Sequence, residues 1–79
     1  MVKLKNIRRT NGYIVCEAFV EDCTESIELK LNETSAELDD YNLPDGYDWC
    51  ISHVTHARKF LRTLIGKPIE STQRTIMWY

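Results

Sequence analysis

The residues of this sequence whose types and spacing suit chemistry lie between positions 47 and 60. Cys50, His53 and His56 recur at every third position, and Cys16 and Cys23 are distant candidates for the same site. Thiolate and imidazole groups bind zinc, which takes four such ligands. Successive steps of three residues rotate around a helix, however, so only neighbouring members of the series share a face. The usual spacings of zinc sites, CxxC and HExxH, do not occur. We therefore predict no metal and no cofactor.

A second chemistry is nucleophilic catalysis, with Cys50 activated by His53 one turn away. A thiol near the start of a helix has a lowered pKa, which favours this hypothesis. Against it, Cys50 lies at the centre of an apolar helical stripe, where cysteine behaves as a small hydrophobic residue. No orienting third group and no glycine motif for an oxyanion hole accompany the pair. We predict no catalytic residue and favour a non-catalytic protein.

A third hypothesis is a binding surface on one flank of the predicted helix. The candidate patch consists of Tyr47, Trp49, His53, His56 and Phe60, with Trp78 or Tyr79 as further members. Exposed aromatic patches mark sites for protein partners or stacked bases. The alternative is that these side chains cover the end of a sheet, with each histidine hydrogen-bonded at the margin of the core. The sequence leaves both interpretations open.

Nucleic-acid binding is the runner-up function. Arg58, Lys59 and Arg62 form a basic face on the predicted helix. A second basic cluster lies in the first predicted hairpin and consists of Lys3, Lys5, Arg8 and Arg9. A basic stripe is the usual footprint of nucleic-acid-binding proteins. The sequence pI of about 5.6 opposes this function, and no zinc-finger, KH or RRM pattern is visible. We therefore rank nucleic acid below a protein partner, which is expected to be a second copy of the chain or an unidentified protein.

Charge is strongly segmented along the chain. Positions 1–16 carry four basic residues and no acid, positions 17–48 carry eleven acids and one base, and positions 49–79 carry five bases and one acid. Either the basic ends pair with the acidic middle on folding, or an acidic surface is presented to a basic partner.

The secondary structure is expected to begin with a β-hairpin. Residues 2–9 and 13–20 are rich in β-forming side chains, and Asn11-Gly12 between them is a strong signal for a tight turn. A two-residue loop pairs Ile7 with Cys16 and Leu4 with Phe19, whereas a three-residue loop pairs Ile7 with Val15. The segment 13–20 is apolar on both faces except at Glu17, which indicates a central strand.

Residues 26–31 alternate cleanly and predict a third strand, and residues 36–41 are a candidate fourth strand at an edge. A helix is predicted over 49–65, with Asp48 as its N-cap and Gly66 at its end. The tail 72–79 is expected to return as a strand. The predicted fold is therefore α+β: an antiparallel sheet of three to five strands with one C-terminal amphipathic helix packed on a face, in the order β-β-β-(β)-α-β.

Length and composition favour one domain over residues 1–79. The hydrophobic fraction of 43% and the charged fraction of 28% are those of a globular chain. There is neither a signal-peptide pattern nor an apolar run long enough to span a membrane. An odd number of cysteines without an export signal favours reduced thiols and a cytoplasmic location, with no membrane partner.

The pattern Leu43-Pro44-x-Gly46-Tyr47-x-x-Cys50-x-x-His53-Val54-x-His56-Ala57, together with the terminal Met77-Trp78-Tyr79, resembles a group of short uncharacterised proteins of Gram-positive bacteria. The resemblance spans nearly the whole chain. It implies a stand-alone bacterial cytosolic protein and brings no activity or ligand.

Overall fold

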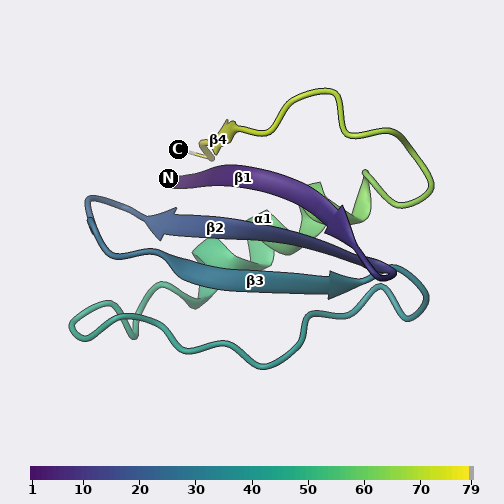
Figure 1. Ribbon diagram of the computed structural model, residues 1–79. Coiled ribbons are helices and arrows are strands. Elements are labelled where there is room, and N and C mark those ends of the chain that lie inside the picture. The colour runs from purple at the N-terminus through teal and green to yellow at the C-terminus, as the bar shows by residue number, and fades with distance from the viewer. Residues whose placement is uncertain (79) are drawn as a thin grey trace.

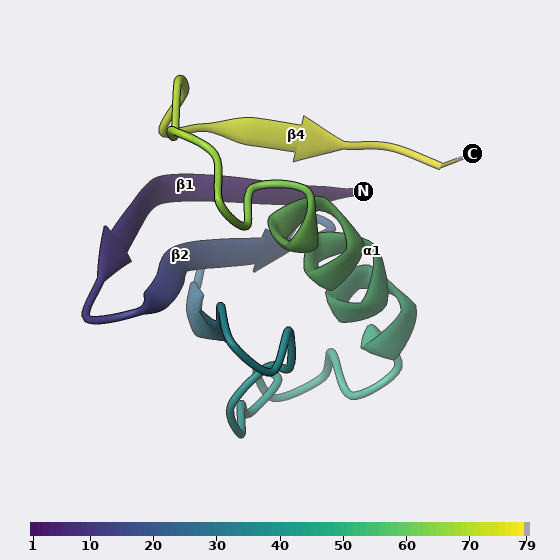
Figure 2. The ribbon, with the colours of Figure 1, turned by 90° about the vertical axis from the view of Figure 1, so that its right-hand side faces the viewer.

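The computed structural model describes residues 1–78 and shows an α+β fold. Its elements are β1 (Val2–Thr10), β2 (Tyr13–Val20), β3 (Ile27–Asn32), α1 (Ile51–Arg62) and β4 (Arg74–Ile76). The strands form one antiparallel sheet in the order β3-β2-β1-β4. Figure 1 shows α1 behind the sheet, and Figure 2 shows it from the side, covering one face. The predicted fold class is confirmed.

The β1–β2 hairpin closes through a two-residue turn, the shorter of the two predicted alternatives. Thr10 pairs with Tyr13, and the backbone φ angles of Asn11 and Gly12 are 50° and 81°. Positive φ at both central residues defines the tight turn whose twist matches that of the strands. Asparagine and glycine occupy these positions because they accept this conformation at low cost.

The register of the hairpin changes between Lys5 and Arg8. Near the turn Arg8 pairs with Val15, but beyond the irregularity Leu4 pairs with Ala18 instead of the expected Phe19. Asn6, with φ of 53°, is the extra residue of this β-bulge. The bulge turns Val2 and Leu4 to the same side as Ile7, and all three are buried. With uninterrupted alternation, Ile7 would lie on the opposite face of the sheet from Val2 and Leu4. The bulge therefore allows both halves of β1 to contribute to the same core.

The core lies between α1 and the sheet. Strand β3 contributes its alternate residues Ile27, Leu29 and Leu31, as predicted, while Glu28 is exposed. Strand β2 is indeed flanked on both sides, by β1 and β3. The core consists of Val2, Leu4, Ile7, Ile14, Cys16, Ala18, Val20, Ile27, Leu29, Leu31, Cys50, Val54, Ala57 and Leu61. Its helical members recur every three or four residues and form a single stripe, which orients α1 on the sheet.

Two local predictions are wrong. Residues 36–41 form no strand: only Leu38 makes a β-bridge, to Leu31. Ala36, with φ of 59°, bends this segment and ends the extended conformation. The helix is also shorter than the predicted 49–65. Asp48 does not cap it, because Cys50 occupies the N-cap position and makes no side-chain cap hydrogen bond. The residues beyond Arg62 continue as turns up to Gly66, whose φ is 74°.

The C-terminal tail returns to the sheet as predicted. Strand β4 pairs antiparallel with β1, with Ile76 opposite Val2 and Thr75 opposite Lys3. The backbone N–H of Ile7 donates to the carbonyl oxygen of Thr72 at 2.9 Å, which extends this contact beyond the strand. Tyr79 lies outside the described residues. Within residues 1–78, no helix has both the length and the apolar character needed to cross a membrane.

Candidate functional site

Trp49 stands out from the turn that precedes α1, with 63% of its surface exposed. Three contacts hold its ring. The indole N–H donates to the carbonyl oxygen of Gly46 at 3.0 Å, Tyr47 stacks at 6.3 Å between centroids, and His53 meets it edge-on at 5.5 Å. The hydroxyl of Tyr47 in turn donates to Asp22 at 2.8 Å, and this bond raises the pKa of Tyr47 to about 12. Trp49 is therefore exposed but fixed in orientation.

His53 is buried, with only 4% of its surface exposed, and does not lie at the border with water. Its Nε2 atom is 2.6 Å from Oε1 of Glu21, which also binds the α-ammonium group of Met1 at 2.7 Å. Nδ1 of His53 has no hydrogen-bond partner within residues 1–78. No sequence pattern marked Glu21 as a partner of His53, because 32 positions separate the two residues.

The C-terminal tail covers the rest of the flank. Trp78 stacks on His56 with centroids 4.2 Å apart and 16° between planes, and it meets His53 edge-on at 4.8 Å. The guanidinium group of Arg74 lies 5.0 Å from the centroid of Phe60. Ring contacts thus join four candidate residues and Trp78 into one aromatic row: Tyr47, Trp49, His53, Trp78 and His56. Phe60 contacts Arg74 and is not part of this row. Trp49 is the member that faces solvent to the greatest extent among the described residues of the row.

The burial of Cys50 opposes the hypothesis that its thiol is a catalytic nucleophile. Its side chain is fully buried, and burial raises the pKa of the thiol. A raised pKa lowers the fraction of thiolate, the nucleophilic form. Cys16 is also buried, and its pKa is raised to about 12 by the same cause. All three cysteines are free, and within residues 1–78 no group of three cysteine, histidine or acidic side chains is arranged to hold a metal ion.

The basic helix face is only partly available for binding. Arg62 donates from Nε to the carbonyl oxygen of Ala36 at 2.8 Å and lies 3.6 Å from a carboxylate oxygen of Glu37. Arg58 is half-buried, whereas Lys59 is exposed. Arg62 therefore packs against the segment that follows β3, and its contact with Glu37 pairs the basic end of the chain with the acidic middle.

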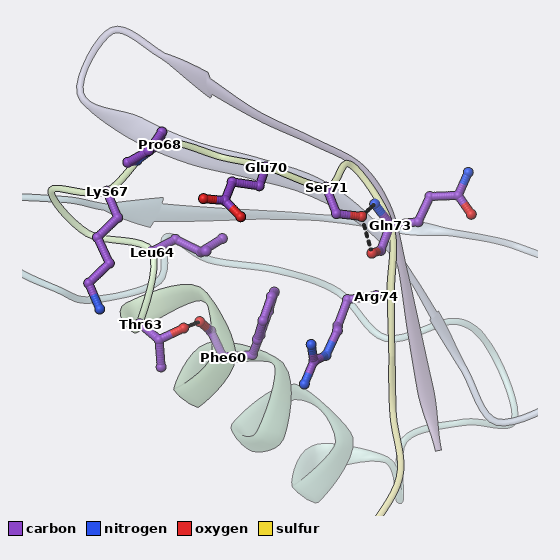
Figure 3. Close-up of a pocket in the computed structure, with 9 residues that line it drawn as sticks. All are labelled: Phe60, Thr63, Leu64, Lys67, Pro68, Glu70, Ser71, Gln73 and Arg74. Carbon is purple, nitrogen blue, oxygen red and sulfur yellow. Dashed lines mark hydrogen bonds between the residues drawn. The ribbon is translucent and has the colours of Figure 1, made fainter.

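An open hollow of about 510 Å³ lies between the end of α1 and the segment that leads to β4 (Figure 3). Its lining includes Phe60, Leu64, Lys67, Glu70 and Arg74. Arg74 lies over the ring of Phe60 and so covers the aromatic part of the hollow. The rest of the lining includes both a positive and a negative side chain, Lys67 and Glu70. The charge of the hollow therefore favours no class of ligand.

The face of the sheet opposite α1 carries two aromatic rings that sequence reasoning did not assign to a site, beside basic residues of the first hairpin. Tyr13 and Phe19 of β2 point away from the helix, and each has a lysine ammonium over its ring: Lys30 at 4.9 Å from Tyr13 and Lys5 at 5.5 Å from Phe19. The alternate spacing of Tyr13, Val15 and Phe19 was the available signal. The apolar character of both faces predicted a central strand, which β2 is, but only its helix-facing side is covered by another element among residues 1–78 (Figure 2).

Comparison with known proteins adds no family. The chain matches no protein-family model, and it has no significant match among curated proteins or solved structures. The site residues themselves therefore carry the functional argument.

Proposed function

We propose that this protein is a non-catalytic binding protein that docks a basic segment of a partner protein on Trp49. The observation that carries the proposal is the exposure of a tryptophan that three contacts already hold in place. Rigid aromatic side chains give much contact area at little cost in conformational entropy, and tryptophan is enriched at the centres of protein interfaces.

The charges around Trp49 indicate the chemistry of the partner. Asp45 and Asp48 flank it in the sequence, and both are exposed. Neither forms an ion pair with any described residue. An arginine or lysine of a partner can lie over the face of the indole while these carboxylates attract its charge. A basic peptide segment is therefore the occupant that fits this surface best.

The direct test uses a fluorescein-labelled hexa-arginine peptide and fluorescence anisotropy at low ionic strength. We expect Trp49→Ala to weaken binding about ten-fold or more. Ile51→Ala is the matched control, because Ile51 is 61% exposed but lies on the opposite flank of α1. We expect no loss from this control. Equal loss from both variants, or no binding by the unmodified protein, contradicts the proposal.

Charge is tested separately with two double variants that remove the same net charge. Asp45→Asn with Asp48→Asn is expected to weaken peptide binding. Asp39→Asn with Asp40→Asn, placed farther from Trp49 in the same acidic segment, is expected to have a smaller effect. Equal effects indicate a general attraction to negative charge and not a site at Trp49.

A second copy of the chain is the competing occupant, since an exposed tryptophan also suits a homodimer interface. Sedimentation equilibrium distinguishes the two. A dimer that is lost in Trp49→Ala and retained in Ile51→Ala assigns the surface to self-association and replaces the basic-segment proposal. The three free thiols support a reducing, cytoplasmic location for either role.

A further inference from the structure

We propose that the open face of the sheet is a second binding site, which takes single-stranded nucleic acid. This face is separate from Trp49 and lies on the side of the sheet away from α1 (Figures 1 and 2). Its defining feature is a repeated unit in which one aromatic ring and two basic side chains line the same hollow, with a lysine over the ring.

The first unit lies near the hairpin turn. Tyr13, Arg8 and Lys30 line a hollow of about 440 Å³ together with Val15 and Glu28. Arg8 pairs across the strands with Val15, which in turn pairs with Lys30. Lys30 places its ammonium group over the ring of Tyr13, whereas the guanidinium group of Arg8 donates to the carbonyl oxygen of Asn6 at 2.9 Å. Glu28 contacts Arg8 only at 3.8 Å, with both side chains well exposed, so this ion pair is weak.

The second unit lies at the other end of β2. Phe19, Lys3 and Lys5 line a hollow of about 210 Å³, with acidic residues of the 21–24 loop along its far side. Lys3 is the direct cross-strand partner of Phe19, and Lys5 places its ammonium group 5.5 Å from the ring. The two rings are six residues apart on one strand, which is a distance of about 20 Å.

This arrangement matches the chemistry of an unpaired strand. Aromatic side chains on a sheet surface stack with bases, and neighbouring cations bind the phosphates. A stacked base takes the place of the lysine over each ring, and the displaced ammonium group then reaches the backbone phosphate. A span of about 20 Å accommodates about three nucleotides between the two rings at the spacing of an extended strand.

Charge complementarity selects this occupant. The strands of the open face carry four bases, Lys3, Lys5, Arg8 and Lys30, against the two acids Glu17 and Glu28, although the whole chain has a net charge of −2. Glu21 and Asp22 also line the second hollow, but Glu21 binds the α-ammonium group of Met1 and Asp22 accepts a hydrogen bond from Tyr47. Glu17 accepts a hydrogen bond from Asn6. Single strands fit better than duplex because stacking on protein rings needs exposed base faces. A four-stranded sheet is also wider than the two-stranded ribbon that the major groove admits.

The test is fluorescence anisotropy with labelled oligonucleotides of about fifteen nucleotides, oligo(dT) and oligo(U), at about 20 mM salt. We expect binding that weakens with salt, and weaker binding of a duplex of the same length. Phe19→Leu and Tyr13→Leu keep apolar volume but remove the stacking ring, and each is expected to weaken binding about ten-fold. Phe19→Trp keeps a ring and is expected to retain binding.

Two charge variants locate the site. Lys3→Gln with Lys5→Gln removes two cations from the open face, and Lys59→Gln with Lys67→Gln removes two exposed cations from the helix side. We expect only the first to weaken binding strongly. Thermal unfolding of each variant confirms that it is folded. The proposal is overturned if the oligonucleotides do not bind, if duplex binds at least as tightly, or if both charge variants lose equal affinity.

Discussion

The two faces of the sheet differ in how the side chains of the same strands are shielded from solvent. The face under α1 is closed and apolar, and Leu29 and Cys16 on it have no exposed surface. The opposite face has no covering element among residues 1–78, yet Val15 on it is only 5% exposed. The long side chains around Val15 shield it: Arg8 and Lys30 pair with it across the strands. Burial on this strand therefore comes from packing on one face and from amphipathic neighbours on the other.

The sharpest test of this difference compares two adjacent residues of β3. Leu29→Ala removes a fully buried side chain, and we expect it to lower the free energy of unfolding by about 3 kcal/mol. Lys30→Ala, on the opposite face, is expected to cost less than about 1 kcal/mol. Urea unfolding monitored by circular dichroism measures both. Similar losses would show that the open face contributes to stability as much as the core does.

The two tryptophans extend the comparison to the rim of the covered face. Trp78 is half-buried between His53 and His56, whereas Trp49 is mostly exposed. We expect Trp78→Ala to lower stability by about 1–2 kcal/mol more than Trp49→Ala does. Thermal unfolding of the two single variants gives the difference. The reverse order would mean that Trp49 is a structural residue and not a binding anchor.

The bulge at Asn6 is expected to be sensitive to side-chain shape. Asn6 has φ of 53°, a conformation that β-branched residues adopt only with strain. Asn6→Val should lower the free energy of unfolding by about 1–2 kcal/mol. Asn6→Gly is the control, because glycine accepts the same backbone angle and also loses the hydrogen bond to Glu17. Chemical unfolding decides: a loss as large for glycine as for valine would trace the effect to the side-chain bond.

The smallest expected effect concerns pH and the thiols. The folded-state pKa of Cys16 is about 12, above its ordinary value of 9.0. The unfolded chain therefore loses this proton first, and stability present below about pH 9 falls as the pH rises. Between about pH 8 and pH 10 the contribution of Cys16 amounts to about 1 kcal/mol.

Measuring unfolding at both pH values in the unmodified protein and in Cys16→Ala isolates this contribution. The variant should show the shallower decline, and an equal decline in both proteins would contradict the assignment. Thiol titration offers a second check. Cys23 is half-exposed and should react before Cys16 and Cys50 in the folded protein.

Much of the fold was predictable because local patterns and tertiary packing agree. The alternation of β3 and the helical stripe from Cys50 to Leu61 each specify one arrangement, whereas Asn11-Gly12 locates the turn and leaves two loop lengths open. Residues 36–41 show an apparent alternation too, but only Leu38 makes a β-bridge, although both Leu38 and Tyr41 pack against the core. The prediction that Asp48 caps the helix is wrong because a turn precedes the helix, in which the N–H of Cys50 donates to the carbonyl oxygen of Tyr47. The helix therefore begins after Cys50, which occupies the N-cap position.

The candidate site was predictable as a group of residues and not as an arrangement. Helical spacing brings His53 and His56 to one flank, but their contacts with Glu21 and Trp78 depend on segments distant in the sequence. Pattern alone could not show which member stays exposed. The open face of the sheet was not predicted as a site because β2 carries apolar residues on both of its faces. The sequence does not distinguish an apolar side chain shielded by neighbouring lysine stems from one buried under a helix.

The bulge in β1 has an electrostatic consequence as well as a packing one. In an uninterrupted strand, Lys3 and Lys5 would face one side and Arg8 the other, because successive side chains alternate. The extra residue shifts the alternation by one position, so all three cations project from the open face and pair across the sheet with Phe19, Glu17 and Val15. The bulge thus places Lys3, Lys5 and Arg8 on the open face of the sheet and Val2, Leu4 and Ile7 on the face under α1.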